Sequence, residues 1–135
     1  MKTFPFMTSK QSIILLRIAV ALFLMAHGLI RIYLGTVGGV GDFLNFTGLF
    51  DWSSTGMGIT VFEIIGGAAM ALGFYVRWIA SVFMIQLIMG IFLVHLEKGW
   101  FVVGASQGGV EYSALLLVCL MVISAHHYGK QQGLH

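Results

Sequence analysis

The stretch TVFEIIGGAAMALGFYVR, residues 60–77, decides what kind of protein this sequence can form. It is apolar almost throughout, yet Glu63 stands in its first turns. A carboxylate in so apolar a segment is costly to bury, needs a partner, and usually marks function when the segment spans a membrane. Gly66 and Gly67 follow soon after, and small residues of this kind let a second helix approach closely. The stretch therefore predicts a tightly packed membrane helix with one buried acid.

The composition of the whole chain supports a membrane protein. Of 135 residues, 59% are hydrophobic and 9% are charged, whereas about a quarter of the residues of a soluble domain are charged. The mean hydropathy is +0.96. The apolar runs are continuous and do not alternate with polar residues, which argues against a porin-like barrel.

We predict an all-α membrane protein, a four-transmembrane-helix bundle that forms a single domain over residues 1–135. Each predicted helix has close to the ~20 residues that cross a bilayer. The helices are expected at about 11–34, 55–76, 78–96 and 109–126. The very short link at Arg77 makes the second and third helices antiparallel neighbours.

A Gly- and Phe-rich connector, residues 35–54, joins the first two predicted helices. Within it, Asp42 can cap a short amphipathic segment, DFLNFTGLF, at 42–50. We expect this segment to form an interfacial helix that lies on the membrane surface.

The positions of lysine and arginine predict the orientation. Loops with more Lys and Arg face the cytoplasm. The side with both termini has Lys2, Lys10, Arg77 and Lys130, and the other side has Arg31 and Lys98. We therefore expect a multi-pass protein of the inner (cytoplasmic) membrane with its N- and C-termini in the cytoplasm.

Two functional classes are disfavoured by composition. The single cysteine, Cys119, cannot form an intrachain disulfide, and no C-x-x-C pair exists for thiol redox chemistry. The net charge is only +2 and no basic run occurs, so no nucleic-acid partner is expected. The expected surroundings are the lipid bilayer and other membrane subunits or further copies of the chain.

Each predicted helix carries a polar residue toward the outer half of the bundle. These residues are His27 and Arg31, Glu63, His95, and Glu111 with Tyr112 beside it. At 1.5 Å per residue, His27 lies roughly 10 Å and Glu63 roughly 12 Å below the outer ends of their helices. Arg17 is deeper, and its long side chain could reach either Glu63 or the cytoplasmic headgroups.

Three interpretations of this cluster stay open. In the first, the network only fixes helix register, as buried polar networks often do. In the second, it binds a quinone, because a quinone carbonyl needs a His or Arg donor and quinol oxidation needs a proton acceptor. In the third, two His and two Glu hold a metal, but the absence of an E-x-x-H pair and the unequal depths argue against it. The same depths argue against a haem held by His27 and His95. We therefore expect no metal and no tightly bound cofactor, and quinone is the one cofactor that the cluster would suit.

Four segments together resemble the DoxX family of small membrane proteins. They are LLRIAVALFLMAHGLIR, TVFEIIGGAAMALGFYVRW, IFLVHLEKGWFV and GGVEYSALLL, which span most of the chain. The motif residues are Arg17, His27, Gly28 and Arg31, then Glu63, Gly66, Gly67, Gly73 and Arg77, then His95 with Gly99, and Glu111-Tyr112. The family usually has a lysine at the position of Arg31; arginine keeps the charge but does not deprotonate.

The resemblance implies a four-helix membrane bundle linked to redox chemistry. The namesake of the family is the small membrane subunit of an archaeal thiosulfate:quinone oxidoreductase, and other members are associated with quinone or catechol stress. It thus implies a small subunit or accessory of a membrane redox system, with quinone bound near His27, Arg31, Glu63, His95 and Glu111. Whether the chain is itself an enzyme stays open. A bundle of this length has no room for its own nucleotide or flavin domain, so in redox chemistry the electrons would come from a partner or go straight to a quinone.

Two rival functions differ in class from a quinone site. The chain could be a purely structural subunit that packs through glycines of its helices without chemistry of its own. The packing glycines would be Gly28, Gly66, Gly67 and Gly73. A transporter is the other rival, although four helices without internal repeats are few for one.

Overall fold

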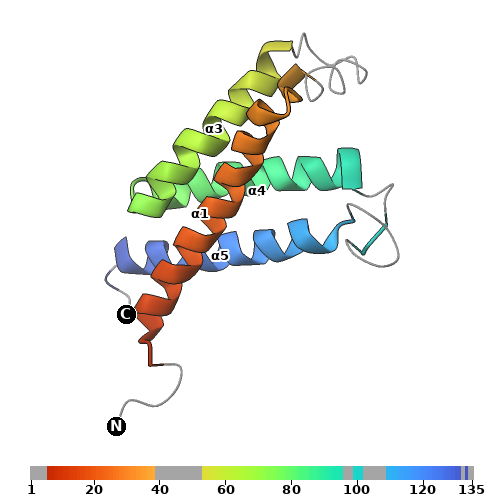
Figure 1. The fold of residues 1–135 in the computed structure, drawn as a ribbon. Coiled ribbons are helices and arrows are strands. Elements are labelled where there is room, and N and C mark those ends of the chain that lie inside the picture. Colours follow the sequence, from red (N-terminus) through yellow and green to blue (C-terminus); the bar gives the residue numbers. More distant parts are fainter. Residues whose placement is uncertain (1–5, 39–52, 96–98, 102–108, 132, 134–135) are drawn as a thin grey trace. The chain divides into compact units, whose positions relative to one another are not determined.

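The computed structural model describes residues 6–38, 53–95, 99–101, 109–131 and 133. Throughout this described part the regular elements are helices (Figure 1). They are α1 (Ser9–Tyr33), α3 (Ser53–Leu72), α4 (Val76–Gly90), the π-helical η1 (Ile91–His95) and α5 (Glu111–Gln131). The predicted interfacial helix at 42–50 lies outside the described residues.

Three helical segments are long and apolar enough to cross a membrane. They are Ser9–Tyr33, Val76–Leu93, in which η1 continues α4, and Glu111–Lys130. A shorter apolar helix covers Gly56–Leu72 within α3. The prediction of an all-α membrane protein with four apolar helices is confirmed.

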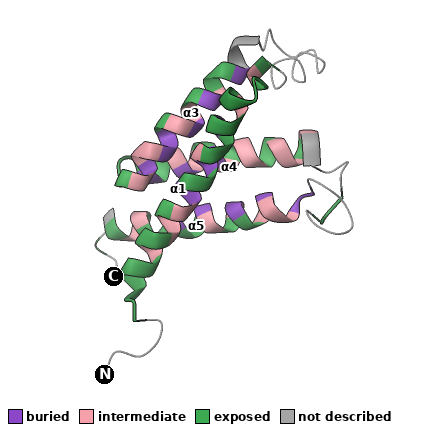
Figure 2. Cartoon of the chain, viewed as in Figure 1, coloured by how far each residue is buried: buried purple, intermediate pink, exposed green. Residues whose placement is uncertain are grey.

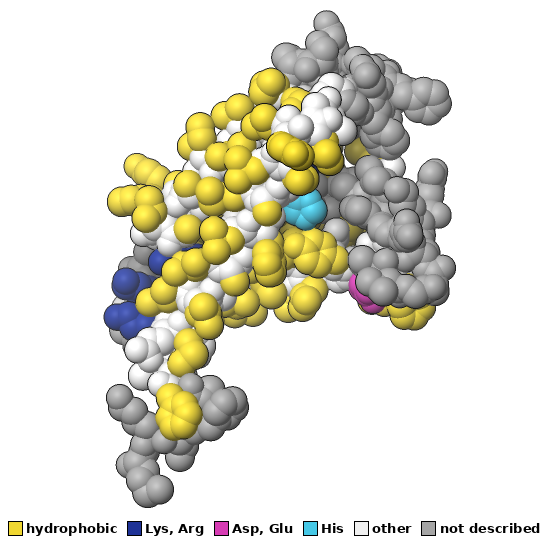
Figure 3. Space-filling view, viewed as in Figure 1, with side chains coloured by type: hydrophobic (Ala, Val, Ile, Leu, Met, Phe, Trp, Pro, Cys, Tyr) yellow, Lys and Arg dark blue, Asp and Glu magenta, His cyan; other side chains and the backbone are white. Residues whose placement is uncertain are grey.

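Large apolar side chains are exposed along these helices, as the green positions in Figure 2 and the yellow surface in Figure 3 show. Examples are Leu22, Ile65 and Phe92, whose exposed fractions are 53%, 65% and 68%. Contact with water would oppose such exposure, whereas lipid tails favour it. These faces are therefore suited to lipid.

The chain divides into two compact units. One, the α1–α3 unit, is residues 21–74 and contains the second half of α1 with α3. The other, the α4–α5 unit, is residues 1–20 and 75–135 and contains the first half of α1 with α4 and α5. The prediction of a single domain stays a prediction.

In the α1–α3 unit, the two helices run antiparallel and approach closely at two glycines. A Cβ added to Gly28 would lie 3.1 Å from the carbonyl oxygen of Thr60. A Cβ added to Gly67 would lie 3.2 Å from the carbonyl oxygen of Ala21 and 2.5 Å from the Met25 side chain. Glycine at both positions lets the two helix backbones approach closely, and an added side chain would require its neighbours to shift.

In the α4–α5 unit, α4 and α5 pack against each other and run antiparallel (Figure 1). The start of α5 is held by the segment before it: the Val110 N–H donates to the Gly99 carbonyl (3.1 Å) and the Glu111 N–H to the Trp100 carbonyl (3.0 Å). Gly109 lies so close to this segment that an added Cβ would meet the Trp100 carbonyl at 2.5 Å. These contacts fix where the fourth apolar helix begins.

The predicted ends of two helices were wrong. The second helix was expected to reach residue 76, but α3 ends at Leu72, where Gly73 takes a positive φ of 94°. The Phe74 N–H then donates to the Ala69 carbonyl (2.9 Å), which satisfies a carbonyl at the helix end. The fourth helix was expected to stop at residue 126, yet α5 continues to Gln131. Apolarity fades there, but the backbone hydrogen bonds of a helix do not depend on apolar side chains.

Candidate functional site

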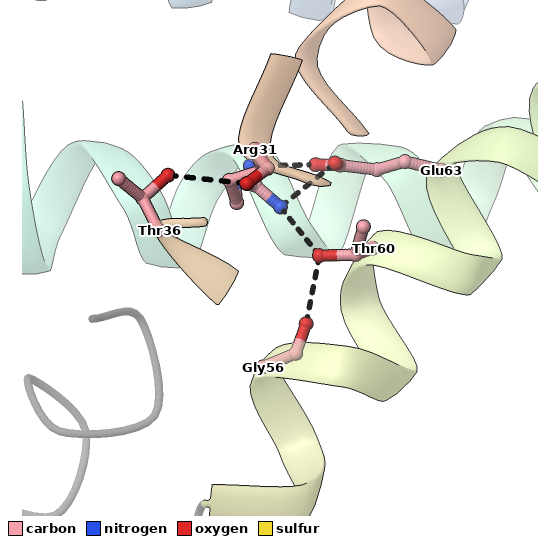
Figure 4. Close-up of polar contacts among 5 residues, drawn as sticks. All are labelled: Arg31, Thr36, Gly56, Thr60 and Glu63. Carbon is pink, nitrogen blue, oxygen red and sulfur yellow. Dashed lines mark hydrogen bonds and ion pairs between the residues drawn. The ribbon is translucent and has the colours of Figure 1, made fainter. Parts of the chain in front are cut away.

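The centre of the α1–α3 unit is an ion pair between Arg31, in the last turn of α1, and Glu63 of α3. Arg31 Nη1 donates to Glu63 Oε2 at 2.8 Å, and Arg31 Nη2 donates to Oε1 at 3.1 Å (Figure 4). Two parallel bonds of this kind are the strongest pairing that a guanidinium makes with a carboxylate. The Glu63 side chain is 3% exposed and that of Arg31 is 21% exposed. The acid is thus enclosed, while part of the base is open.

Thr60 extends the ion pair into a short chain of hydrogen bonds. Arg31 Nη1 also donates to Thr60 Oγ1 at 3.4 Å, and the Thr60 hydroxyl donates to the Gly56 carbonyl at 2.9 Å (Figure 4). Three of the five N–H groups of a guanidinium are therefore engaged, two by Glu63 and one by Thr60. The other two N–H groups of Arg31 have no acceptor among the described residues.

Gly28 explains why the pair can form. It lies one turn before Arg31, and a Cβ there would stand 3.2 Å from Glu63 Cβ and 3.0 Å from Ile64 Cγ1. The close approach of the helices brings the acid within reach of the guanidinium. On the far side of Arg31, the Thr36 N–H donates to the Arg31 carbonyl (3.0 Å), which closes the end of α1.

The other glycines predicted to pack helices lie elsewhere. An added Cβ on Gly66 would meet the Phe62 ring of the same helix at 3.2 Å, so this residue faces a neighbour in α3. Gly73 forms the positive-φ turn after α3. Of the four predicted packing glycines, Gly28 and Gly67 are the two that face α1–α3 contacts.

His27 is exposed, although it is next to the buried Gly28 in α1. Successive residues of a helix point about 100° apart, so the residue beside a contact position turns away from the contact. The prediction that His27 lines the same site as Glu63 stays a prediction.

The α4–α5 unit holds the other predicted site residues. His95 ends the π-helical segment η1, a type of distortion that often occurs at functional sites. Glu111 begins α5, and it and Tyr112 are half-buried. Their grouping with the residues of the α1–α3 unit stays a prediction.

Arg17 has a partner that sequence reasoning missed. Its Nη1 lies 3.1 Å from Nε2 of His127, whose Nδ1 lies 3.0 Å from the Ile123 carbonyl oxygen. A carbonyl only accepts and a guanidinium only donates, so His127 is neutral, with its proton on Nδ1. His127 is about 24 Å along α5 from Glu111. Within this unit, Arg17 therefore lies at the opposite end of α5 from Glu111 and Tyr112.

Among the described residues, no three His, Cys, Asp or Glu side chains are grouped closely enough to hold a metal ion. What the described geometry offers is a buried carboxylate that holds a partly open guanidinium in an apolar helix pair. That arrangement can bind and polarise an oxygen of a small ligand.

Comparison with known families identifies the chain. The DoxX family model matches residues 12–96. The chain belongs to the DoxX family. The match includes Arg17, His27, Arg31, Glu63 and His95, and ends before α5. No curated protein and no solved structure matches the chain. Membership of this family supports the conclusion that the chain is a small membrane protein.

Proposed function

We propose that this DoxX-family protein is a small integral subunit or accessory of a membrane redox system that binds a quinone at Arg31. The observation that carries the proposal is the Arg31–Glu63 pair. The carboxylate side chain is 3% exposed, whereas the arginine side chain is 21% exposed and has two N–H groups without an acceptor among the described residues. The two quinone carbonyl oxygens are acceptors, and the rest of the molecule is apolar like the helices around the site. The protein would lie in the inner membrane with both termini in the cytoplasm.

The roles of the two charged residues differ. Arg31 stays protonated, so it orients and polarises the quinone oxygen without giving up a proton. Glu63 holds the guanidinium in place and balances its charge in the apolar surroundings. Reduction of a quinone to a quinol takes two electrons and two protons. The electrons would come from a partner subunit, and His27, in the same unit as Arg31, would relay the protons.

The first test is extraction of lipids from the protein purified in a gentle detergent. Near-stoichiometric quinone is expected in the wild-type protein and in Lys10→Gln, an exposed change elsewhere in α1. Arg31→Gln should lose most of the quinone while it remains folded, and Arg31→Lys should keep part of it. Quinone retained in full by Arg31→Gln would refute a site at Arg31.

A structural subunit remains a second candidate, and the glycine contacts bear on it. Gly28 and Gly67 face α1–α3 contacts within this chain, so they do not offer a free glycine surface to another subunit. In this version the ion pair only fixes the register of α1 and α3. Absence of quinone from the wild-type protein, together with recovery of a larger membrane complex in the same preparation, would favour it.

A further inference from the structure

One end of the α4–α5 unit carries a group of cationic and aromatic side chains that the quinone proposal does not use. This basic–aromatic cluster is composed of Arg17, Arg77, Trp78, His127, Tyr128 and Lys130. The guanidinium carbon of Arg77 lies 4.6 Å from the centroid of the Tyr128 ring and 6.0 Å from that of Trp78. Arg17 bonds to His127, the residue before Tyr128. Two arginines are therefore anchored on successive residues of α5.

The cluster has an excess of positive charge. Arg77 and Lys130 are exposed, and among the described residues neither side chain forms an ion pair with a carboxylate. Lys130 is three residues after His127 and so lies one turn along the helix from it. On the face drawn in Figure 3, Lys and Arg side chains gather in one place, and most of the other coloured side chains are apolar.

The length of α5 places this cluster at a membrane surface. Glu111 and Lys130 are separated by about 28 Å along the helix, close to the ~30 Å thickness of the hydrocarbon core. When Glu111 is at one surface, Lys130 is at the other. Trp78 and Tyr128, 70% and 43% exposed, are the aromatic types that prefer headgroup depth.

We infer that the basic–aromatic cluster is a binding site for the headgroup of an anionic phospholipid. Arg77 and Lys130 pair with the phosphate, and Trp78 lies against the glycerol region and the upper acyl chains. Tyr128 holds the Arg77 guanidinium toward the lipid by its cation–π contact. This inference does not depend on the quinone site, because it uses different residues of a different unit.

The test uses Trp78 as a reporter in the full-length protein. Trp52→Phe and Trp100→Phe leave Trp78 as the single tryptophan. The protein is placed in phosphatidylcholine vesicles with a minor fraction of lipid brominated near the headgroup, either phosphatidylglycerol or phosphatidylcholine. The quenching of Trp78 fluorescence by each brominated lipid is compared, and gives the ratio of the affinities for phosphatidylglycerol and phosphatidylcholine. Each of the two exposed cations, Arg77 and Lys130, should raise the affinity for the anionic lipid about fivefold. Phosphatidylglycerol should therefore be preferred over phosphatidylcholine about 25-fold.

Matched variants distinguish a specific headgroup site from non-specific attraction between a cationic protein and anionic lipid. Arg77→Gln combined with Lys130→Gln should bring the ratio close to one, while Lys10→Gln, an exposed cation outside the cluster, should leave it unchanged. Tyr128→Phe should keep the preference and Tyr128→Leu should lower it severalfold, because a phenyl ring still holds Arg77. Far-ultraviolet circular dichroism of each variant checks that the helices are intact.

Three outcomes would overturn the inference. Equal quenching by the two lipids would show that the headgroup is not recognised. If Lys10→Gln lost as much of the preference for phosphatidylglycerol as the double variant of Arg77 and Lys130 does, the attraction would be non-specific. Suppression of the preference by inorganic phosphate beyond the effect of chloride at the same ionic strength would assign the site to free phosphate.

Discussion

The ion pair between Arg31 and Glu63 is asymmetric, and each partner should respond differently to removal. Glu63 is the more enclosed of the two, so Arg31→Met leaves a buried carboxylate without its cation, at a cost of about 3 kcal/mol. Glu63→Leu should cost less, because the partly exposed guanidinium can turn toward headgroups. The double variant should be less destabilised than the sum by about 1–3 kcal/mol. Thermal unfolding in detergent, followed by circular dichroism, measures all three; additive effects would mean that the two residues do not interact.

The bond between Arg17 and His127 gives a second prediction. His127→Leu removes the acceptor for the Arg17 guanidinium and should lower the free energy of unfolding by about 1 kcal/mol. His127→Gln keeps a side-chain oxygen near the same position and should recover most of that loss. The same unfolding assay measures both variants. Equal losses in both would show that the hydrogen bond to Arg17 contributes nothing.

These two pairs show what the sequence can and cannot specify about a side chain. The need of Glu63 for a partner follows from its apolar surroundings, and the sequence predicts Arg31 in the same polar cluster. The hydrogen bond between Arg17 and His127 could not be predicted, because the two residues are 110 positions apart and no local spacing connects them. A long arginine side chain has several partners within reach, and only the placement of α5 selects one.

At the scale of the elements, the contact between α1 and α3 depends on glycine. Gly28→Ala should destabilise the protein by about 1–3 kcal/mol, because the new methyl group would meet the Thr60 carbonyl oxygen and Glu63 Cβ. Gly58→Ala is the matched control in α3, where nothing lies within 4 Å of an added Cβ. It should stabilise α3 by up to about 1 kcal/mol, since alanine favours helix over glycine.

Unfolding midpoints of the two variants should therefore move in opposite directions. A midpoint of Gly28→Ala at or above the wild-type value would show that the helices can separate at no cost. The quinone content of Gly28→Ala should fall as well, because displacement of α3 moves Glu63 away from Arg31.

The existence of the helices was predictable from the sequence, and their ends were not. Long continuous apolar runs specify α1, α4 and α5 as membrane helices without reference to anything else. The end of α3 depends on Gly73, one of several glycines in that stretch, and no pattern distinguishes it from Gly66 and Gly67. The last turn of α5 contains polar residues that a hydropathy boundary excludes.

At the scale of the whole molecule, the orientation in the membrane can be tested with single cysteines. The chain has one native cysteine, so Cys119→Ser gives a cysteine-free background. We predict that a cysteine at Lys130 is protected from a membrane-impermeant maleimide added to intact cells. A cysteine at Phe101, exposed in the segment before α5, should be labelled. Detergent should make both positions reactive.

This prediction follows from charge and from the length of α5 together. Arg77 and Lys130 lie at the end of the α4–α5 unit where Arg77 contacts Tyr128, and Glu111 lies about 28 Å away along α5. The positive-inside rule then places the cationic end in the cytoplasm. Labelling of the cysteine at position 130 and protection of the cysteine at position 101 would show that the orientation is the reverse of the predicted one. The basic–aromatic cluster would then face the outer leaflet.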